Sequence, residues 1–212
     1  VGYDSVHTLL SRSRRGKTDR DSSDPARNFS FVGVLDSRFT AVQLDTKLLL
    51  LDHSRVSYYL FYQLCLRRFA CAPKITLKHP VPVFSFIRTA LDLPEAQWDA
   101  KQDRSKDEIA SAATSVLVEH AEMLSEYFRV GISTASADSG ENGEKVASVF
   151  DSDAQRAMLV HLPALLDGYI PLTTALPMFL LRLATDTQWD SELECLLPTA
   201  PTAHHTPCSV CV

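Results

Sequence analysis

The chain has 212 residues, of which 45% are hydrophobic and 22% are charged, and this composition is ordinary for a globular protein. The length suits one domain of two lobes or two small domains. The net charge of −5 excludes the basic excess that a free-standing nucleic-acid-binding protein usually has, so any DNA contact is expected to be local or through a partner.

Membrane association is not expected, because the apolar runs are shorter than the roughly 20 residues that a membrane-spanning helix needs. The first residues, VGYDSVHTLLSRSRRGK, lack the apolar core and cleavage site of a signal peptide. The chain has five cysteines, and an odd number without a signal peptide is typical of reduced thiols in the cytosol or nucleus.

The N-terminal part of the chain predicts a short helix, a polar loop and three strands. Val6, Leu9 and Leu10 have the spacing of an amphipathic helix. The polar residues 12–27 predict a loop, and we interpret their arginines as solvated rather than as a DNA-binding patch. The segment NFSFVGVLDSRFTAVQLDTKLLLLD then predicts an antiparallel meander: strands begin at Phe29, Phe39 and Lys47 and are separated by short polar turns.

Helical and extended patterns alternate after the meander. The stretch HSRVSYYLFYQLCLRRFAC predicts a helix with Ser54 as its N-cap, and KITLKHP predicts a strand. A short helix is expected in VPVFSFIRTALDLP, and a long one follows, capped by Asp103 or Ser105. The stretches YFRVGIS and AMLVHLP predict strands, whereas the apolar run PMFLLRLA fits either a buried strand or a helix.

These elements predict an α+β architecture in which helices cover one face of an antiparallel sheet and a second lobe surrounds the long helix. The polar residues near 134–153 are expected to form a mobile insertion. The proline-containing tail, residues 198–212, is expected to be disordered.

Catalytic and metal-binding patterns are weak in this chain. Asp52, His53 and Ser54 are neighbours at a strand-to-helix junction, where their side chains diverge, so capping explains them better than a nucleophilic triad. We interpret Trp98 and Trp189 as packing residues. A zinc site in the tail stays open as an alternative, with four candidate ligands: His204, His205, Cys208 and Cys211.

Four blocks in the same order resemble the C-terminal domain of eukaryotic DNA mismatch repair MutL homologues, and the closest group is MutL homologue one. The last block is LPALLDGYIPLTTALPMFLLRLATDTQWDSELEC; the earlier ones are FSFVGVLDSRFTAVQLDTKLLLLD with LFYQ, FIRTALDLPE and HAEMLSEYF. The resemblance implies an outer lobe plus a dimerisation lobe within residues 28–197. It also implies a nuclear protein with no cofactor, and the family's N-terminal ATPase lies outside these residues.

The resemblance implies the non-nuclease subunit of the MutL-alpha heterodimer. The paralogous partners have a metal-dependent nuclease motif, Asp-Gln-His-Ala followed by two glutamates. At the matching positions this chain keeps only His53 of the motif, and Ser57 and Tyr62 replace the glutamates that gather a hard cation. The end of the chain also departs from the family, because it lacks the final Phe-Glu-Arg-Cys.

The implied partner is a nuclease-bearing MutL paralogue; MutS-type proteins and an exonuclease would associate through the assembled complex. Two alternatives stay open: a metal-dependent endonuclease with an unrecognised ligand set, and a DNA-binding protein with a zinc tail. The candidate residues of the partner interface are Gln43, Tyr169, Pro171, Leu176, Pro177 and Phe179.

Overall fold

A computed structural model describes residue 6 and residues 8–11, 29–134 and 153–189. The expected insertion, apart from its ends, and the expected tail lie outside the described residues. The described part of the expected N-terminal helix, Val6 and residues 8–11, is helical. The strands are β1 (Phe29–Val34), β2 (Phe39–Leu44), β3 (Lys47–Asp52), β4 (Lys74–Pro82), β5 (Gly131–Thr134) and β6 (Ala157–Pro163). The main helices are α2 (His53–Arg67), α3 (Val83–Ala90), α4 (Lys106–Glu119) and α6 (Leu176–Thr185).

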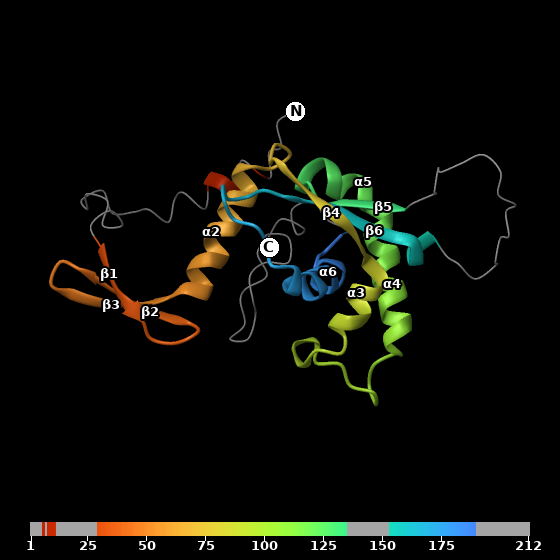
Figure 1. The fold of residues 1–212 in the computed structure, drawn as a ribbon, viewed down its shortest axis with the longest axis horizontal. Coiled ribbons are helices and arrows are strands. Elements are labelled where there is room, and N and C mark those ends of the chain that lie inside the picture. The colour runs from red at the N-terminus through yellow and green to blue at the C-terminus, as the bar shows by residue number, and fades with distance from the viewer. Residues whose placement is uncertain (1–5, 7, 12–28, 135–152, 190–212) are drawn as a thin grey trace, which may run out of the picture.

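The first three strands form the antiparallel meander that the sequence predicts, in the order β1-β2-β3. The turn between β1 and β2 is fixed by Asp36, whose Oδ1 accepts hydrogen bonds from the backbone N–H groups of Arg38 and Phe39, each at 2.7 Å. These two hydrogen bonds hold the pKa of Asp36 below its usual value. Figure 1 shows the meander set apart from the rest of the chain, with α2 leading away from it.

Helix α2 joins the meander to the second lobe, and its N-cap differs from the expectation. We expected Ser54 to cap the helix, but Asp52 does so: its side chain accepts a hydrogen bond from the backbone N–H of Arg55 at 3.1 Å. Asp52 also pairs with Arg38 at 2.8 Å. The helix therefore begins two residues earlier than a cap at Ser54 would allow, directly after β3.

The second lobe has a three-stranded antiparallel sheet in the order β4-β6-β5, with α3, α4 and α6 packed together beneath it (Figure 1). The sequence predicted helices over one face of the meander, but they cover this second sheet instead, and among the described elements only α2 contacts the meander closely. The fold is α+β, as the sequence predicts.

Of the two residues expected to cap α4, Asp103 and Ser105, the structure has Ser105. Its hydroxyl accepts from the backbone N–H of Glu108, and the Glu108 carboxylate accepts from that of Ser105, which completes a capping box. The predicted long helix breaks at His120 and continues as a short helix, α5 (Ala121–Met123), and a π-helical turn, η3 (Leu124–Phe128). The ring of Trp189 lies 4.5 Å from the His120 ring, and its Nε1 donates to the carbonyl of Ala184. Trp189 is therefore a packing residue, as expected.

The ambiguous run PMFLLRLA forms most of α6, which is enclosed by the core of the second lobe. Leu180 and Leu183 are fully buried, and α3, α4 and β6 supply other fully buried neighbours such as Ile87, Leu117 and Leu159. Six of the ten residues of α6 are buried and Arg182 is its only charged residue, so the run is apolar along nearly its whole length. A nearly continuous apolar run fits a buried strand as well as a buried helix. None of the described helices has the length and apolar content that crossing a membrane requires.

Candidate partner-binding surface

Large apolar side chains of the meander are exposed. Phe31 and Leu48, on its two edge strands, each keep 65% of their surface accessible. The exposed set also includes Phe29, Val32, Val34, Leu35, Leu49 and Leu50. Contiguous apolar exposure of this kind marks an interaction surface in a soluble protein, because water contact with so much apolar surface is costly.

The strand register puts exposed apolar side chains on both faces of the meander. Phe31 and Leu49 are both paired with Val42, so these two side chains share one face. Leu50 is paired with Ala41, the next residue along β2, and therefore lies on the opposite face. An antiparallel sheet commonly has one face packed against the core and the other exposed to water. This meander instead has two apolar faces.

Helix α2 continues the apolar exposure beyond the meander. Val56, Tyr59 and Leu60 are exposed, and their spacing of three and four residues places them on one side of the helix. An amphipathic helix normally turns such a stripe toward its own core. In α2 the stripe is accessible to a partner.

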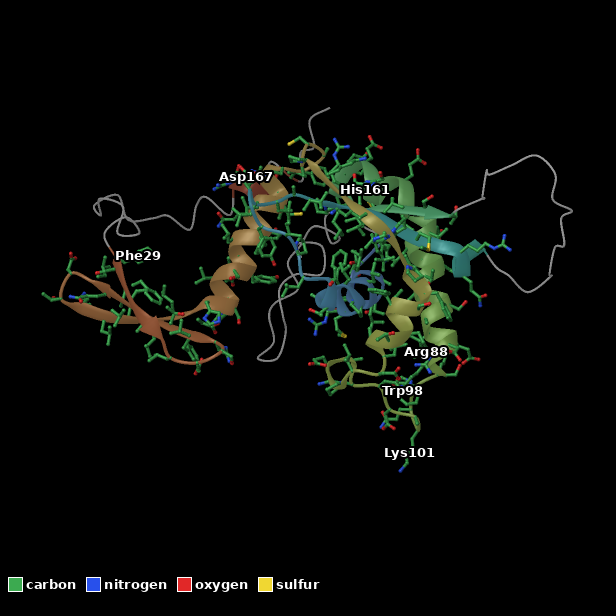
Figure 2. All side chains as sticks on the ribbon, viewed as in Figure 1. Phe29, Arg88, Trp98, Lys101, His161 and Asp167 are labelled. Carbon is green, nitrogen blue, oxygen red and sulfur yellow. The ribbon has the colours of Figure 1, made fainter. Side chains whose placement is uncertain are left out.

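The segment before α6 is held against α2 and is also apolar and exposed. Arg68 donates to the carbonyl of Ala164 at 2.8 Å and reaches the Asp167 carboxylate at 3.4 Å. The rings of Phe61 and Tyr169 lie 5.2 Å apart. Figure 2 labels Asp167 beside α2. The exposed apolar residues of this segment are Leu166, Tyr169, Ile170 and Leu172.

These three regions define the apolar surface: the meander, the stripe on α2 and residues 166–172. Two of the residues predicted for the partner interface are accessible: Gln43 is exposed and Tyr169 is 40% exposed. The sequence did not single out Ile170 and Leu172, which are 74% and 70% exposed. The only local signal for them was their position between Gly168 and the 3-10 turn η5 (Thr173–Ala175), in a stretch without core periodicity.

The remaining predicted interface residues are less exposed. Pro171 and Pro177 are half-buried. Leu176 and Phe179, at 2% and 3% exposed, are part of the core of the second lobe. Their burial corrects the expectation that these two side chains form the platform, because a side chain enclosed by its own core is not accessible to a partner.

The strand-to-helix junction that matches the nuclease motif is occupied by structural hydrogen bonds. Nε2 of His53 lies 2.7 Å from the carbonyl oxygen of Ser37 and donates to it, and Nδ1 lies within hydrogen-bond distance of Thr40 Oγ1, at 3.3 Å. Both ring nitrogens are therefore engaged. Within residues 29–134 and 153–189, no group of three or more His, Cys, Asp or Glu side chains could hold a metal ion. The candidate zinc ligands of the tail lie outside the described residues.

Comparison with known proteins gives consistent matches. The family model described as DNA mismatch repair protein Mlh1 C-terminus matches residues 3–200. The DNA mismatch repair protein Mlh1 of Dictyostelium discoideum is 36% identical over 92% of this chain and 20% of its own length. The DNA mismatch repair protein MLH1 of Saccharomyces cerevisiae is 35% identical over 84% of this chain and 21% of its own length. The chain thus spans about a fifth of these relatives.

Proposed function

Because the chain belongs to the family of Mlh1 C-termini of DNA mismatch repair proteins, we propose that it is the heterodimerisation and docking module of a MutL-type protein. Its partner in this proposal is a nuclease-bearing MutL paralogue, as in the MutL-alpha heterodimer. MutS-type proteins and an exonuclease would associate through the assembled complex. The module would act in the nucleus.

The observation that carries the proposal is the apolar exposure on both faces of the meander. Subunits that pair stably bury apolar side chains at the centre of their interface, and obligate interfaces bury about 2,000 Å² or more. The apolar surface spans a sheet, a helix stripe and a loop, and it has the composition that such an interface needs. A chain whose role was complete without a partner would be expected to cover these side chains itself.

The proposed role in this chain is binding rather than catalysis. The residues that match the paralogues' nuclease motif are used for folding: Asp52 caps α2, and His53 ties α2 to the turn before β2. Ser57 and Tyr62, which take the places of the two glutamates, offer no carboxylate to a metal ion. The cleaving subunit of the proposed heterodimer would therefore be the paralogue.

Charge placed on the apolar surface tests the proposal. The chain is co-expressed with a tagged, nuclease-bearing MutL paralogue from the same source, as wild type and as Leu50→Glu or Ile170→Glu. Both substituted side chains are largely exposed, so the chain should keep its fold. Gln102→Glu is the matched control, since it adds the same charge at an exposed position in the loop before α4.

The expected result is that the tagged paralogue retains wild type and Gln102→Glu but loses most of Leu50→Glu and Ile170→Glu. An unpaired charge at the centre of an apolar interface costs several kcal/mol, on the order of a thousandfold in affinity. Equal retention of all four chains would show that the apolar surface is not the interface. Thermal unfolding of each purified chain verifies that the losses do not come from unfolding.

A further inference from the structure

One long stretch of this acidic chain has basic residues and no acidic ones. From His53 to Leu91 the sequence contains six Arg and Lys residues and no Asp or Glu, although the net charge of the chain is −5. This stretch includes α2, β4 and α3. A run of 39 residues without a carboxylate leaves its cations dependent on other elements for neutralisation.

Some of these cations are neutralised in the fold. Arg88 pairs with Asp92 at 3.1 Å and with Asp107 at 2.7 Å, and Arg68 contacts Asp167. Lys74 and Lys78 of β4 are exposed, and neither makes an ion pair with a carboxylate of the described residues. These two lysines are the available charges of the second lobe's edge strand.

A third cation lies near the start of β4. Arg129 is two residues before β5 and donates from Nη2 to the carbonyl of Ala70, in the loop that leads into β4. Its Nε is buried and has no hydrogen-bond partner among the described residues. Burial, and then the charges of Lys74 and Arg129, lower the pKa of His161, on the central strand β6. Lys74 and Arg129 are therefore both close enough to His161 to disfavour its protonated form.

We propose that this basic edge, formed by Lys74 and Lys78 of β4 with Arg129 near the start of that strand, contacts the phosphate backbone of double-stranded DNA. Lysine and arginine side chains, helped by hydroxyl groups such as that of the exposed Thr76, are the usual partners of phosphate oxygens. The contact goes beyond heterodimerisation, since it lies on the second lobe and uses none of the apolar surface.

The chemistry of the edge favours nucleic acid over an acidic protein. Among the described residues, the exposed large apolar side chains lie on the meander, on α2, at Leu93 and in the loop after β6, and none lies on β4, β5 or β6. A protein partner would be expected to bury an apolar centre there. A contact that is polar throughout and positively charged has the character of a protein–DNA interface, which is wetter and more basic.

Lysines on an edge strand also deter pairing between sheets, and that role needs no ligand. The two roles differ in a measurable way, because only phosphate contacts release counterions and make DNA affinity depend on these lysines. The contact is expected to be weak, independent of base sequence and sensitive to salt. It would supplement a DNA contact that another part of the assembled protein makes.

The test measures binding of the 212-residue chain to a fluorescently labelled DNA duplex by anisotropy over a series of salt concentrations. The test variant is Lys74→Glu with Lys78→Glu. The control variant is Lys47→Glu with Lys101→Glu, which makes the same change in net charge at two exposed lysines. Figure 2 shows Lys101 at the end of the lobe opposite His161. A polyglutamate chain with the same number of charges as the duplex serves as competitor.

The expected result is a loss of roughly tenfold or more in affinity for the test variant and a salt slope smaller by about two, since each phosphate contact contributes about 0.9 to it. The control variant should bind like wild type. The proposal is overturned if wild type does not bind at low salt, or if both variants lose the same affinity. Displacement of the duplex by polyglutamate at equal charge would also overturn the assignment to DNA, in favour of an acidic protein segment.

Discussion

The imidazole of His161 lies over Gly131, in the space where any larger residue at position 131 would place its Cβ. The two residues face each other across β6 and β5, where they are paired in the register, and the register shifts directly after them. The absence of a side chain on one strand is therefore what admits the imidazole on the other. This pair gives two predictions.

Gly131→Ala should destabilise the chain. Replacing glycine by alanine usually stabilises a protein by about 0.4–1 kcal/mol, because it lowers the conformational entropy of the unfolded chain. Overpacking against the imidazole ring costs about 1–3 kcal/mol, so the net effect is a loss of stability. Urea unfolding measures the difference. In a His161→Ala background the same substitution should cost little, because the ring is gone. An equal cost in both backgrounds would mean that the ring is not what excludes the side chain.

The lowered pKa of His161 should make stability depend on pH. Burial comes first, followed by the charges of Lys74 and Arg129, and together they hold the pKa of folded His161 below the ordinary 6.5. The unfolded chain then binds a proton at higher pH than the folded chain does. The contribution of His161 is therefore fully present above 6.5 and is lost as the pH falls from 6.5 toward the lower folded pKa.

Urea midpoints at about pH 7.5 and about pH 5.5 measure this dependence, which should be smaller in His161→Gln. The pKa values of Asp36, Asp52 and Asp92 are lowered from 3.8. Their contributions to stability are therefore lost only in more acid solution and do not change between the two pH values compared. If wild type and His161→Gln respond alike to pH, then His161 does not titrate in this way.

Arg68 should matter more to stability than Asp167, although the two form an ion pair. The side chain of Asp167 is 90% exposed and its contact with Arg68 is 3.4 Å long, and an exposed pair contributes only about 0–1 kcal/mol. The Arg68 bond to the Ala164 carbonyl is shorter and part-buried, and a bond from a charged donor contributes about 1.5–3 kcal/mol. Urea unfolding of Arg68→Ala and Asp167→Ala should show this order, and equal losses would contradict it.

Asp52→Ala should lower the urea midpoint, whereas Ser54→Ala should leave it nearly unchanged. Asp52 caps α2 through the N–H of Arg55 and pairs with Arg38, so its removal frees a helix-terminal donor and an arginine. Ser54 lies inside the first turn of α2, and surface substitutions of this kind usually change stability by less than about 0.5 kcal/mol. Urea unfolding curves of the two variants, measured side by side, test both expectations. A larger decrease in the midpoint for Ser54→Ala would show that Ser54 caps the helix.

Local patterns in the sequence were enough to predict the elements whose structure depends on residues close in the sequence. The meander followed from alternating apolar residues and from the turn at Asp36, and the start of α4 followed from the capping box of Ser105 and Glu108. The run around Leu180 could not be assigned, because it is apolar along nearly its whole length and such a run fits a buried strand as well as a buried helix.

The candidate surface could be predicted only in part, because exposure is a property of the whole fold. An alternating strand predicts that one face is covered, but it does not say whether by its own core or by a partner. Phe179 and Ile170 are both large apolar residues of the same family block, yet one is 3% and the other 74% exposed. The meeting of Gly131 with His161 joins positions 30 residues apart, and no local pattern contains it.

The most direct test of heterodimerisation is the mass in solution of this chain mixed with its nuclease-bearing MutL paralogue, measured by light scattering on the eluting protein. We predict a single species whose mass is the sum of one copy of each chain, with the 23.5 kDa of this chain as one component. Separate elution of the two chains at their monomer masses would contradict the proposed role of the apolar surface.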